Sequence, residues 1–412
     1  MTSRANLIAR AVISQFNKLP AKRKPAIRDN GLHEWVPLSG IVAEQDGNLT
    51  CLALATGMKC LPASKLPEAN GNGLHDWHAE ILAIRTFNRF LLDECSSLCE
   101  GGARTGVLEQ NETHGGSKSG MQYAPPFQVR DDVKLHMYCS EAPCTCRGDA
   151  SMELTMAAQD DASPWPAPTP SPTSNGETPL PGRAYFSHLG VVRRKPARGD
   201  APPTLSKSCS DKLALKQCTS LLSSLASLLV DPARAYIDTL VLPASQHSAA
   251  ACGRAFSGSG RMRALAGAAW PGGYAFRPFA VETTTEEFEF SRRAVQARSD
   301  SISPSNLAAA WSCSGVEESI IGGVIQGRKP FDQRGASRMS RRQMWTAAIG
   351  IARQLDGHDE LKHHLSGQTY REIKDGPLLA PRRAVKAEVR ETALAGWLRN
   401  EGDSDWGVDG AA

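Results

Sequence analysis

A histidine and a glutamate, separated by one residue, open the most regular apolar pattern in the chain. After His78-Ala79-Glu80, apolar residues recur at helical spacing as far as Asp93, which predicts a helix over 78–93 with the pair in its first turn. Farther along, Val133 to Cys139 alternates as a strand does, and Pro143-Cys144 follows directly. Helices and strands alternate through the rest of the chain as well, so the fold class is α/β or α+β.

These residues have the chemistry of a catalytic zinc site. A zinc ion in such a site takes three protein ligands and keeps a fourth position for water. His78 and Cys144 are candidate ligands, and Glu80 can reach the same pocket without binding the metal. His-x-Glu followed by Pro-Cys is the pattern of zinc-dependent nucleobase deaminases, in which the glutamate transfers protons. A His-Ala-Glu triplet alone is more often a solvated helix start, so the prediction depends on the Pro-Cys that follows the strand.

The third ligand has more than one candidate. In the common pattern a second cysteine stands three residues after the first, but residue 147 is Arg. Cys146 is only two residues from Cys144, which is awkward for joint ligation from one helix start. Cys209, in Ser208-Cys209-Ser210-Asp211-Lys212, is the distant alternative.

The segment around Cys209 resembles a mark of the adenosine-to-inosine editing deaminases, which act on double-stranded RNA or on tRNA. Other segments agree with this family: Gly57–Cys60, His75–Glu80, Gly148–Met152, Arg194–Asp200, Ala336–Arg338 and Tyr370–Lys374. The resemblance covers nearly all of residues 5–400 outside two insertions. It is closest to the tRNA-specific branch, because we expect no double-stranded-RNA-binding domain ahead of the catalytic part.

The resemblance implies a fold and a set of ligands. The expected fold is a cytidine-deaminase-like core sheet flanked by helices, elaborated as a single adenosine-deaminase editing domain over 1–412. Zinc ligands carry over to His78, Cys144 and Cys209, and the proton shuttle to Glu80. The family has Gly directly after the first cysteine, whereas here three residues precede Gly148, so Cys146 remains an alternative to Cys144.

The resemblance also implies a buried inositol hexakisphosphate under a basic cluster. The matching positions are Arg85, Lys212, Arg341, Tyr370, Lys374 and Trp397. A polyphosphate that neutralises such a cluster becomes part of the core, because burying unpaired cations is prohibitive. Two family arginines are Ile84 and Leu215 here, which predicts a thinner phosphate shell or an altered site. Taken one at a time, these cations are more typical of a solvated surface.

The implied reaction is hydrolytic deamination of adenosine in tRNA, in the anticodon loop just 3′ of the anticodon of alanine tRNA. A loop nucleotide is already single stranded, so exposing its base costs little. Lys59 and other cations near the motifs are candidate phosphate contacts, although charge runs usually form solvated faces. The alternatives are adenosine editing of other RNA, a free-nucleoside deaminase, or a non-catalytic RNA-binding module with a structural zinc. An intact Glu80 argues against the last, because a structural zinc needs no carboxylate beside it.

Composition limits the partners and the cellular compartment that we expect for the protein. The net charge of +4 permits binding to nucleic acid without arguing for it, and no apolar stretch is long enough for a transmembrane helix. The 11 cysteines are odd in number and accompany no secretion signal, which favours reduced thiols and a metal site over disulfides. The acid-free first 25 residues resemble a transit peptide, but apolar spacing over 5–19 favours a core helix. We expect a cytoplasmic and/or nuclear protein with no membrane contact and no obligatory protein partner, and flexible insertions at 100–128 and 159–183, the latter proline-rich.

Overall fold

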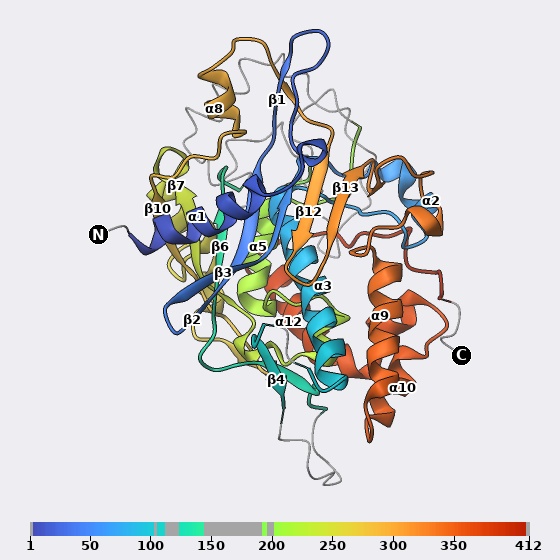
Figure 1. Ribbon diagram of the computed structural model, residues 1–412. Coiled ribbons are helices and arrows are strands. Elements are labelled where there is room, and N and C mark those ends of the chain that lie inside the picture. Colours follow the sequence, from blue (N-terminus) through green and yellow to red (C-terminus); the bar gives the residue numbers. More distant parts are fainter. Residues whose placement is uncertain (1–2, 103–104, 112–122, 144–191, 196–201, 409–412) are drawn as a thin grey trace.

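A mixed eight-stranded sheet forms the centre of the molecule (Figure 1). The computed structural model describes residues 3–102, 105–111, 123–143, 192–195 and 202–408, and the statements below refer to them. The sheet order is β10-β7-β6-β2-β3-β12-β13-β14. Its strands are β2 (Leu38–Gln45), β3 (Asn48–Thr56), β6 (Lys134–Cys139), β7 (Ile237–Pro243), β10 (Ala280–Thr284), β12 (Ala308–Ser312), β13 (Glu317–Ile321) and β14 (Val324–Ile325).

The two halves of the sheet differ in direction. β10, β7 and β6 are parallel, whereas β6, β2, β3, β12, β13 and β14 pair antiparallel. Three two-stranded pairs stand apart from it: β1 (His33–Trp35) with β11 (Ile302–Pro304), β4 (Leu108–Gln110) with β5 (Phe127–Val129), and β8 (Ala269–Trp270) with β9 (Tyr274–Ala275). Parallel strands need a crossover between them, and the chain between β6 and β7 supplies α5, which bears on the site.

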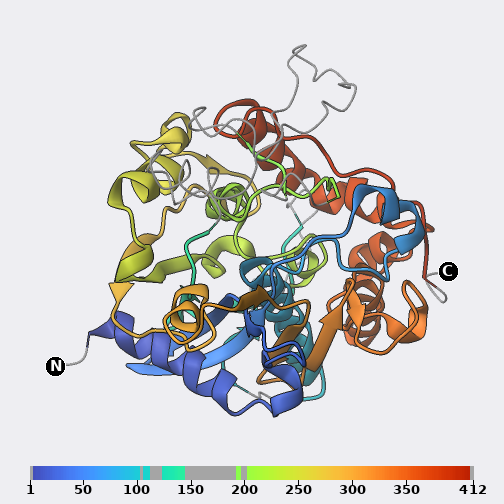
Figure 2. The ribbon, with the colours of Figure 1, turned by 90° about the horizontal axis from the view of Figure 1, so that it is seen from above.

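Helices cover both faces of the sheet (Figure 2). α1 (Arg4–Asn17) packs on one face against residues such as Val42 and Leu54, and α3 (Ala79–Cys99) on the other against Ile41 and Ala53. This division follows from the pleat, because neighbouring residues of a strand point to opposite faces. The remaining helices are α2 (Leu66–Ala69), α5 (Cys209–Thr219), α6 (Ala226–Leu229), α7 (Ala249–Phe256), α8 (Arg292–Gln296), α9 (Arg341–Gln354), α10 (Asp359–Leu365), α11 (Tyr370–Asp375) and α12 (Ala380–Glu391).

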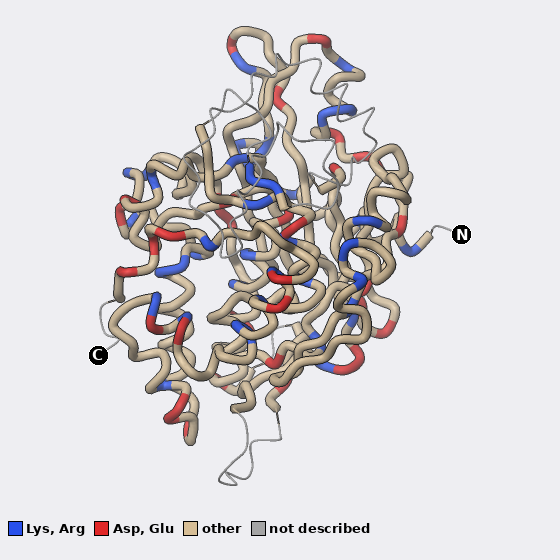
Figure 3. The backbone as a smooth tube through the Cα atoms, turned by 180° about the vertical axis from the view of Figure 1, so that it is seen from behind, with Lys and Arg blue, Asp and Glu red and all other residues tan. Residues whose placement is uncertain are grey.

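The helices α5, α9 and α12 form a second layer beyond α3. α3 contacts α9, and α5 contacts α12. Figure 3 shows the Lys and Arg positions from the side on which α12 lies. The core of this layer is continuous with the core under α3, so the cationic helices of the C-terminal half are tied to the helix that begins at His78.

Most of the predicted elements are confirmed. The helix over 5–19 is α1, and the 78–93 helix is α3. The turn residues 45–48 between the short runs 35–43 and 49–55 also predict a β-hairpin, which is β2–β3 with Asp46 and Gly47 at positive φ in its turn. The mixed α/β class and the core sheet flanked by helices are confirmed as well.

Three details of the sequence analysis are wrong. The leucines between Leu213 and Leu229 predict one helical segment after Lys212, but Ser220 takes φ 56° and ends α5, so the segment is divided. The alternation over 276–290 yields only the short strand β10. The last segment, predicted as helical from 384 to 399, leaves the helix after Glu391, so Trp397 follows α12 rather than lying in it.

Of the two predicted insertions, the structure describes 100–128 except for residues 103–104 and 112–122. At the two ends of the 100–128 range, Val107, Leu108 and Phe127 are buried in the main core beside α3. The Gly, Ser and Thr content of this range concealed a few apolar residues that are sufficient to pack β4 and β5. The proline-rich segment 159–183 and the predicted helix at 150–158 lie entirely outside the described residues.

Among the residues that the structure describes, no helix combines the length and the apolar character needed to cross a bilayer.

Candidate active site

Two helices begin at the candidate metal ligands. His78 is the N-terminal cap of α3, and Cys209 is the first residue of α5, whose cap Ser208 accepts a hydrogen bond from the Asp211 backbone. The N-terminus of a helix carries a partial positive charge, which favours thiolate over thiol. Both residues therefore lie where backbone geometry fixes their positions, although they are far apart in the sequence.

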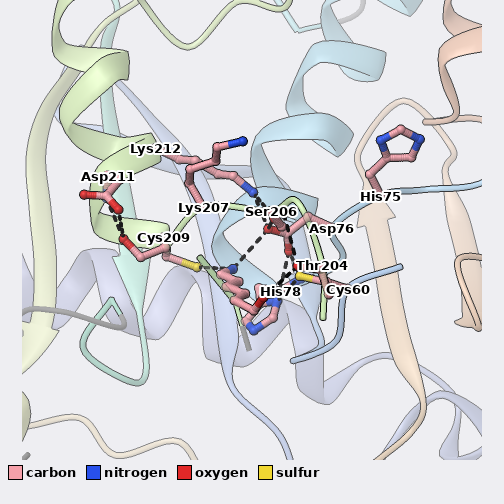
Figure 4. Close-up of polar contacts among 12 residues, drawn as sticks. Cys60, His75, Asp76, His78, Thr204, Ser206, Lys207, Cys209, Asp211 and Lys212 are labelled. Atoms are coloured by element: carbon pink, nitrogen blue, oxygen red, sulfur yellow. Dashed lines mark hydrogen bonds and ion pairs between the residues drawn. The ribbon is translucent and has the colours of Figure 1, made fainter. Parts of the chain in front are cut away.

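A short chain of polar contacts joins the two helix starts (Figure 4). The Lys195 ammonium lies 3.0 Å from the Cys209 sulfur and 3.0 Å from Oδ2 of Asp76. The other carboxylate oxygen of Asp76 lies 2.9 Å from Nδ1 of His78 and also accepts from the His78 backbone N–H. The contacts therefore link His78 to Cys209 through Asp76 and Lys195.

Asp76 is buried and surrounded by donors. Its Oδ2 accepts from Lys195, from Lys212 and, at 2.6 Å, from Ser206. Burial alone would raise the pKa of Asp76, but Lys195 and Lys212 hold that pKa well below its usual range. The charged carboxylate orients the His78 ring, which is the usual role of a carboxylate beside a metal-binding histidine.

One group of three potential ligands lies together in the described part of the chain. The ligand atoms of Cys60, Asp76 and His78 are all within 4.8 Å of one another. This group shares only His78 with the set expected from sequence. Since Asp76 already accepts three side-chain donors through Oδ2, it acts more readily as the orienting residue than as a ligand. The Cys60 sulfur, 3.5 Å from Nδ1 of His78, is a close neighbour of the site.

The remaining predicted residues have the following places. Glu80 lies in the first turn of α3 and is buried. Lys59 contributes its backbone carbonyl, which accepts from the Trp77 N–H and lies 3.2 Å from Nδ1 of His78. Cys144 and Cys146 lie outside the described residues, which reach Pro143 on that side.

Two neighbouring cavities lie beyond the site, among the cationic helices. The smaller, of about 230 Å³, is lined by five of the predicted cofactor residues: Arg85, Lys212, Arg341, Tyr370 and Trp397. The larger, of about 580 Å³, is lined by the sixth, Lys374, and again by Trp397. Lys212 therefore touches both the smaller cavity and Asp76.

The lining is strongly cationic. Ile84 and Leu215 line the smaller cavity, as expected for two missing arginines. Other cations that were not predicted are present: Lys216 in the smaller cavity and Arg382, Arg383, Lys386, Arg390 and Arg399 in the larger. Burial and neighbouring cations lower the pKa of Lys374 to about 8, and they lower the pKa values of Lys216 and Lys386 well below the usual range. A bound polyanion would stabilise the charged forms of these lysine and arginine side chains.

Sequence reasoning gave Lys195 only a weak role, as one of the cations that could contact RNA phosphates, whereas the structure buries it against Asp76 and Cys209. It gave no role to Asp76, Ser206 or Cys60. Asp76 had one usable signal, because an acid two residues before a metal-binding histidine in an extended segment points to the same side. Lys195 and Ser206 had none, since their contacts to Asp76 span more than a hundred residues.

The sheet with helices on both faces, and the helix that opens with His-x-Glu, define a deaminase-like α/β enzyme core. The adenosine-deaminase (editase) domain family matches the chain over residues 53–401, and the chain belongs to that family. A Schizosaccharomyces pombe protein named tRNA-specific adenosine deaminase 1 is 35% identical over 403 residues, covering 97% of this chain and 95% of its own. Proteins of the same name from Saccharomyces cerevisiae and Homo sapiens are 34% identical over 230 residues and 30% identical over 249 residues. These matches cover 53% and 56% of this chain, and 53% and 46% of the two relatives.

Proposed function

We propose that the protein converts adenosine to inosine in tRNA by zinc-dependent hydrolytic deamination. The observation that supports the proposal is the chain of contacts through Asp76 and Lys195 that links His78, the cap of α3, to Cys209, the first residue of α5. Glu80 lies in the first turn of α3. The family and the relatives named as tRNA-specific deaminases support the substrate class.

The donor set suits zinc. An imidazole and thiolates are ligands that Zn²⁺ takes in three-ligand catalytic sites. His78, Cys209 and Cys144 would hold the ion, with Cys146 as the alternative to Cys144. A zinc ion there supplies Lewis-acid activation of the attacking water.

Side chains of the protein transfer protons, orient His78 and contact the RNA. Glu80 takes one proton from the attacking water and gives it to the ring nitrogen, and it then passes the second proton of that water to the departing amine, so that adenosine and water give inosine and ammonia. Asp76, held charged by Lys195 and Lys212, keeps the His78 ring in one orientation. Lys59, whose backbone lies against His78, is the candidate for contact with an RNA phosphate.

The proposed target is the adenosine just 3′ of the anticodon in alanine tRNA. A base in the anticodon loop is unpaired, so bringing it into a pocket costs less than extracting it from a duplex. The experiment that tests the proposal compares tRNA incubated with and without the purified protein by sequencing, where inosine reads as guanosine. We expect a new adenosine-to-guanosine signal in the anticodon loop, and a signal confined to free adenosine or to duplex RNA would contradict the proposal.

A non-catalytic zinc module is the alternative from another class. A structural zinc site needs no proton-transferring carboxylate, yet Glu80 is buried beside His78. Full zinc occupancy with no turnover of any RNA would favour this alternative.

We further propose that the two cavities hold inositol hexakisphosphate. The support is the lining: the half-buried ammonium groups of Lys216 and Lys386, whose pKa values burial and neighbouring cations lower, are costly without a counter-ion, and a compound with many phosphates supplies several negative charges. Hydrogen bonds from Lys216 and Arg382 to the carbonyls of 219–222 hold these side chains in place at the cavities.

Reversing one charge in the larger cavity tests this proposal. We expect Lys386→Glu to remove the polyphosphate and to lower the melting temperature, because a carboxylate would then face the phosphates. The measurement is the mass and phosphorus content released when the purified protein is denatured. Lys329→Glu, at an exposed loop position, is the matched control and should keep the ligand. Wild-type protein that releases no phosphorylated compound contradicts the proposal.

A further inference from the structure

Hydrogen bonds and ring contacts hold the segment 397–407 against α9 and α11. The backbone N–H groups of Tyr370 and Arg371 donate to the carbonyls of Trp406 and Ser404, both at 2.9 Å. The Trp406 ring stacks on Tyr370 with centroids 4.9 Å apart and planes 9° from parallel. Gly71 lies directly under this ring, where a Cβ would be 2.2 Å from the indole. The segment therefore packs directly against the loop that precedes His78.

Asp403 is the buried acid of this segment. Its Oδ1 accepts from the Gly71 N–H at 2.8 Å, and its Oδ2 lies 2.6 Å from Nε2 of His75 and 3.0 Å from Arg341. Burial would raise the pKa of Asp403, but the His75 hydrogen bond and the Arg341 charge lower it, so the carboxylate is charged. One carboxylate thus joins the loop before the active site to the first residue of α9, whose side chain lines the smaller cavity.

The contacts of His75 fix its protonation state. Arg341 can only donate, and it faces both ring nitrogens, with Nη2 2.9 Å from Nδ1 and Nη1 3.1 Å from Nε2. The charged Asp403 carboxylate, which can only accept, is closer to Nε2 at 2.6 Å, so the proton is assigned to Nε2 and Nδ1 accepts. Burial and the charge of Arg341 lower the pKa of His75 to about 3, which keeps the ring neutral. The side chain is therefore a neutral bridge between a fixed anion and a fixed cation.

His75 and Asp76 point to opposite sides of an extended segment. In Figure 4 the His75 ring lies on the far side of the backbone from the cluster around Asp76. The segment pairs with residues 59–61 through an isolated antiparallel bridge between Cys60 and Asp76, in which Leu61 N–H donates to the His75 carbonyl and Trp77 N–H to the Lys59 carbonyl, both at 3.0 Å. A shift at His75 would therefore be transmitted through the backbone to Asp76 and His78.

We propose that Asp403 is a positioning residue of the deaminase site, acting through His75 to fix the segment that carries Asp76 and His78. It touches neither the substrate nor the reacting atoms. Its carboxylate orients the His75 imidazole, and the imidazole fixes the position of the extended segment. This inference rests on the proposed function and adds to it a residue outside the metal and proton-transfer groups.

The test compares two aspartates of the same segment. Asp403 is buried, whereas Asp405 forms an exposed pair with Arg371, so Asp405→Ala is the matched control. We expect Asp403→Ala to lower kcat on tRNA at least tenfold with KM changed less than threefold and zinc retained. Asp405→Ala should stay within twofold of wild type in both constants. Asp403→Asn keeps an acceptor for His75 without the charge and should recover part of kcat.

A second measurement separates this inference from the proposed function. Amide hydrogen exchange of the peptide spanning 70–78 needs no activity, and we expect it to quicken in Asp403→Ala but not in Asp405→Ala. If wild type is inactive on tRNA but the exchange changes as expected, the proposed function fails while the positioning contact stands. Equal kcat values for the two alanine variants, or unchanged exchange at 70–78, would overturn the inference. Should Asp403→Ala not fold, the same comparison is made with Asp403→Asn.

Discussion

Glu80→Gln abolishes inosine formation while the protein keeps its zinc. The amide has the size of the carboxylate and retains an acceptor oxygen, but it cannot take up and return a proton. General acid–base catalysis contributes roughly 10² to 10⁴ in rate, so we expect a loss of about 10³-fold or more in kcat. The measurement is single-turnover inosine formation on tRNA, paired with metal analysis of the same preparation.

The control for this substitution is in the same helix. Glu94 is also a buried carboxylate of α3, but it binds Thr105, remote from His78. Glu94→Gln should retain most of the rate even where it lowers stability. A Glu80→Gln variant that works at the wild-type rate would mean that another group transfers the protons, and that the site is not of the deaminase type.

Cys209→Ala loses zinc, and with it activity. A catalytic zinc site has three protein ligands, so removing one thiolate leaves two, which hold the ion far less tightly. We expect metal content to fall from near one ion per chain to near none after dialysis. The measurement is elemental analysis alongside the melting temperature with and without added zinc.

Cys218 provides the comparison for Cys209. It is a buried thiol in the same helix, α5, and its Cys218→Ala variant should keep the ion. If Cys209→Ala keeps its metal, then Cys144 and Cys146 share the ion and the ligand set stated above is incorrect. Loss of metal in both variants would indicate a general disturbance of α5 instead.

The sheet and its two covering helices could be predicted because the local patterns were strong. α3 has apolar residues at helical spacing over its whole length, and the β2–β3 turn contains Asp46-Gly47, whose backbone suits a tight hairpin. β12 and β13 were missed, since both are only five residues long and the Ala-rich run of β12 carries little strand signal; β12 is specified by its pairing with β3, and β13 by its pairing with β12. Tertiary pairing, not local propensity, decides such strands.

The candidate site was predictable only in part. His78 and Glu80 stand in one motif, and the place of Cys209 came from resemblance rather than from spacing. The link from Lys195 to Asp76 depends on how the crossover between β6 and β7 folds back on α3, which no local pattern encodes. The same holds for the cations of α12, which look like a solvated face in sequence and line a cavity in the structure.

The pairing of β3 with β12 also determines when, during synthesis, the second edge of β3 can be covered. β3 ends at Thr56, and its outer neighbour begins only at Ala308. Until that later strand has left the ribosome, β3 is the open border of a sheet, with unpaired N–H and C=O groups on an apolar strand. A chain truncated before Ala308 would therefore leave this edge of β3 open to pairing with another strand.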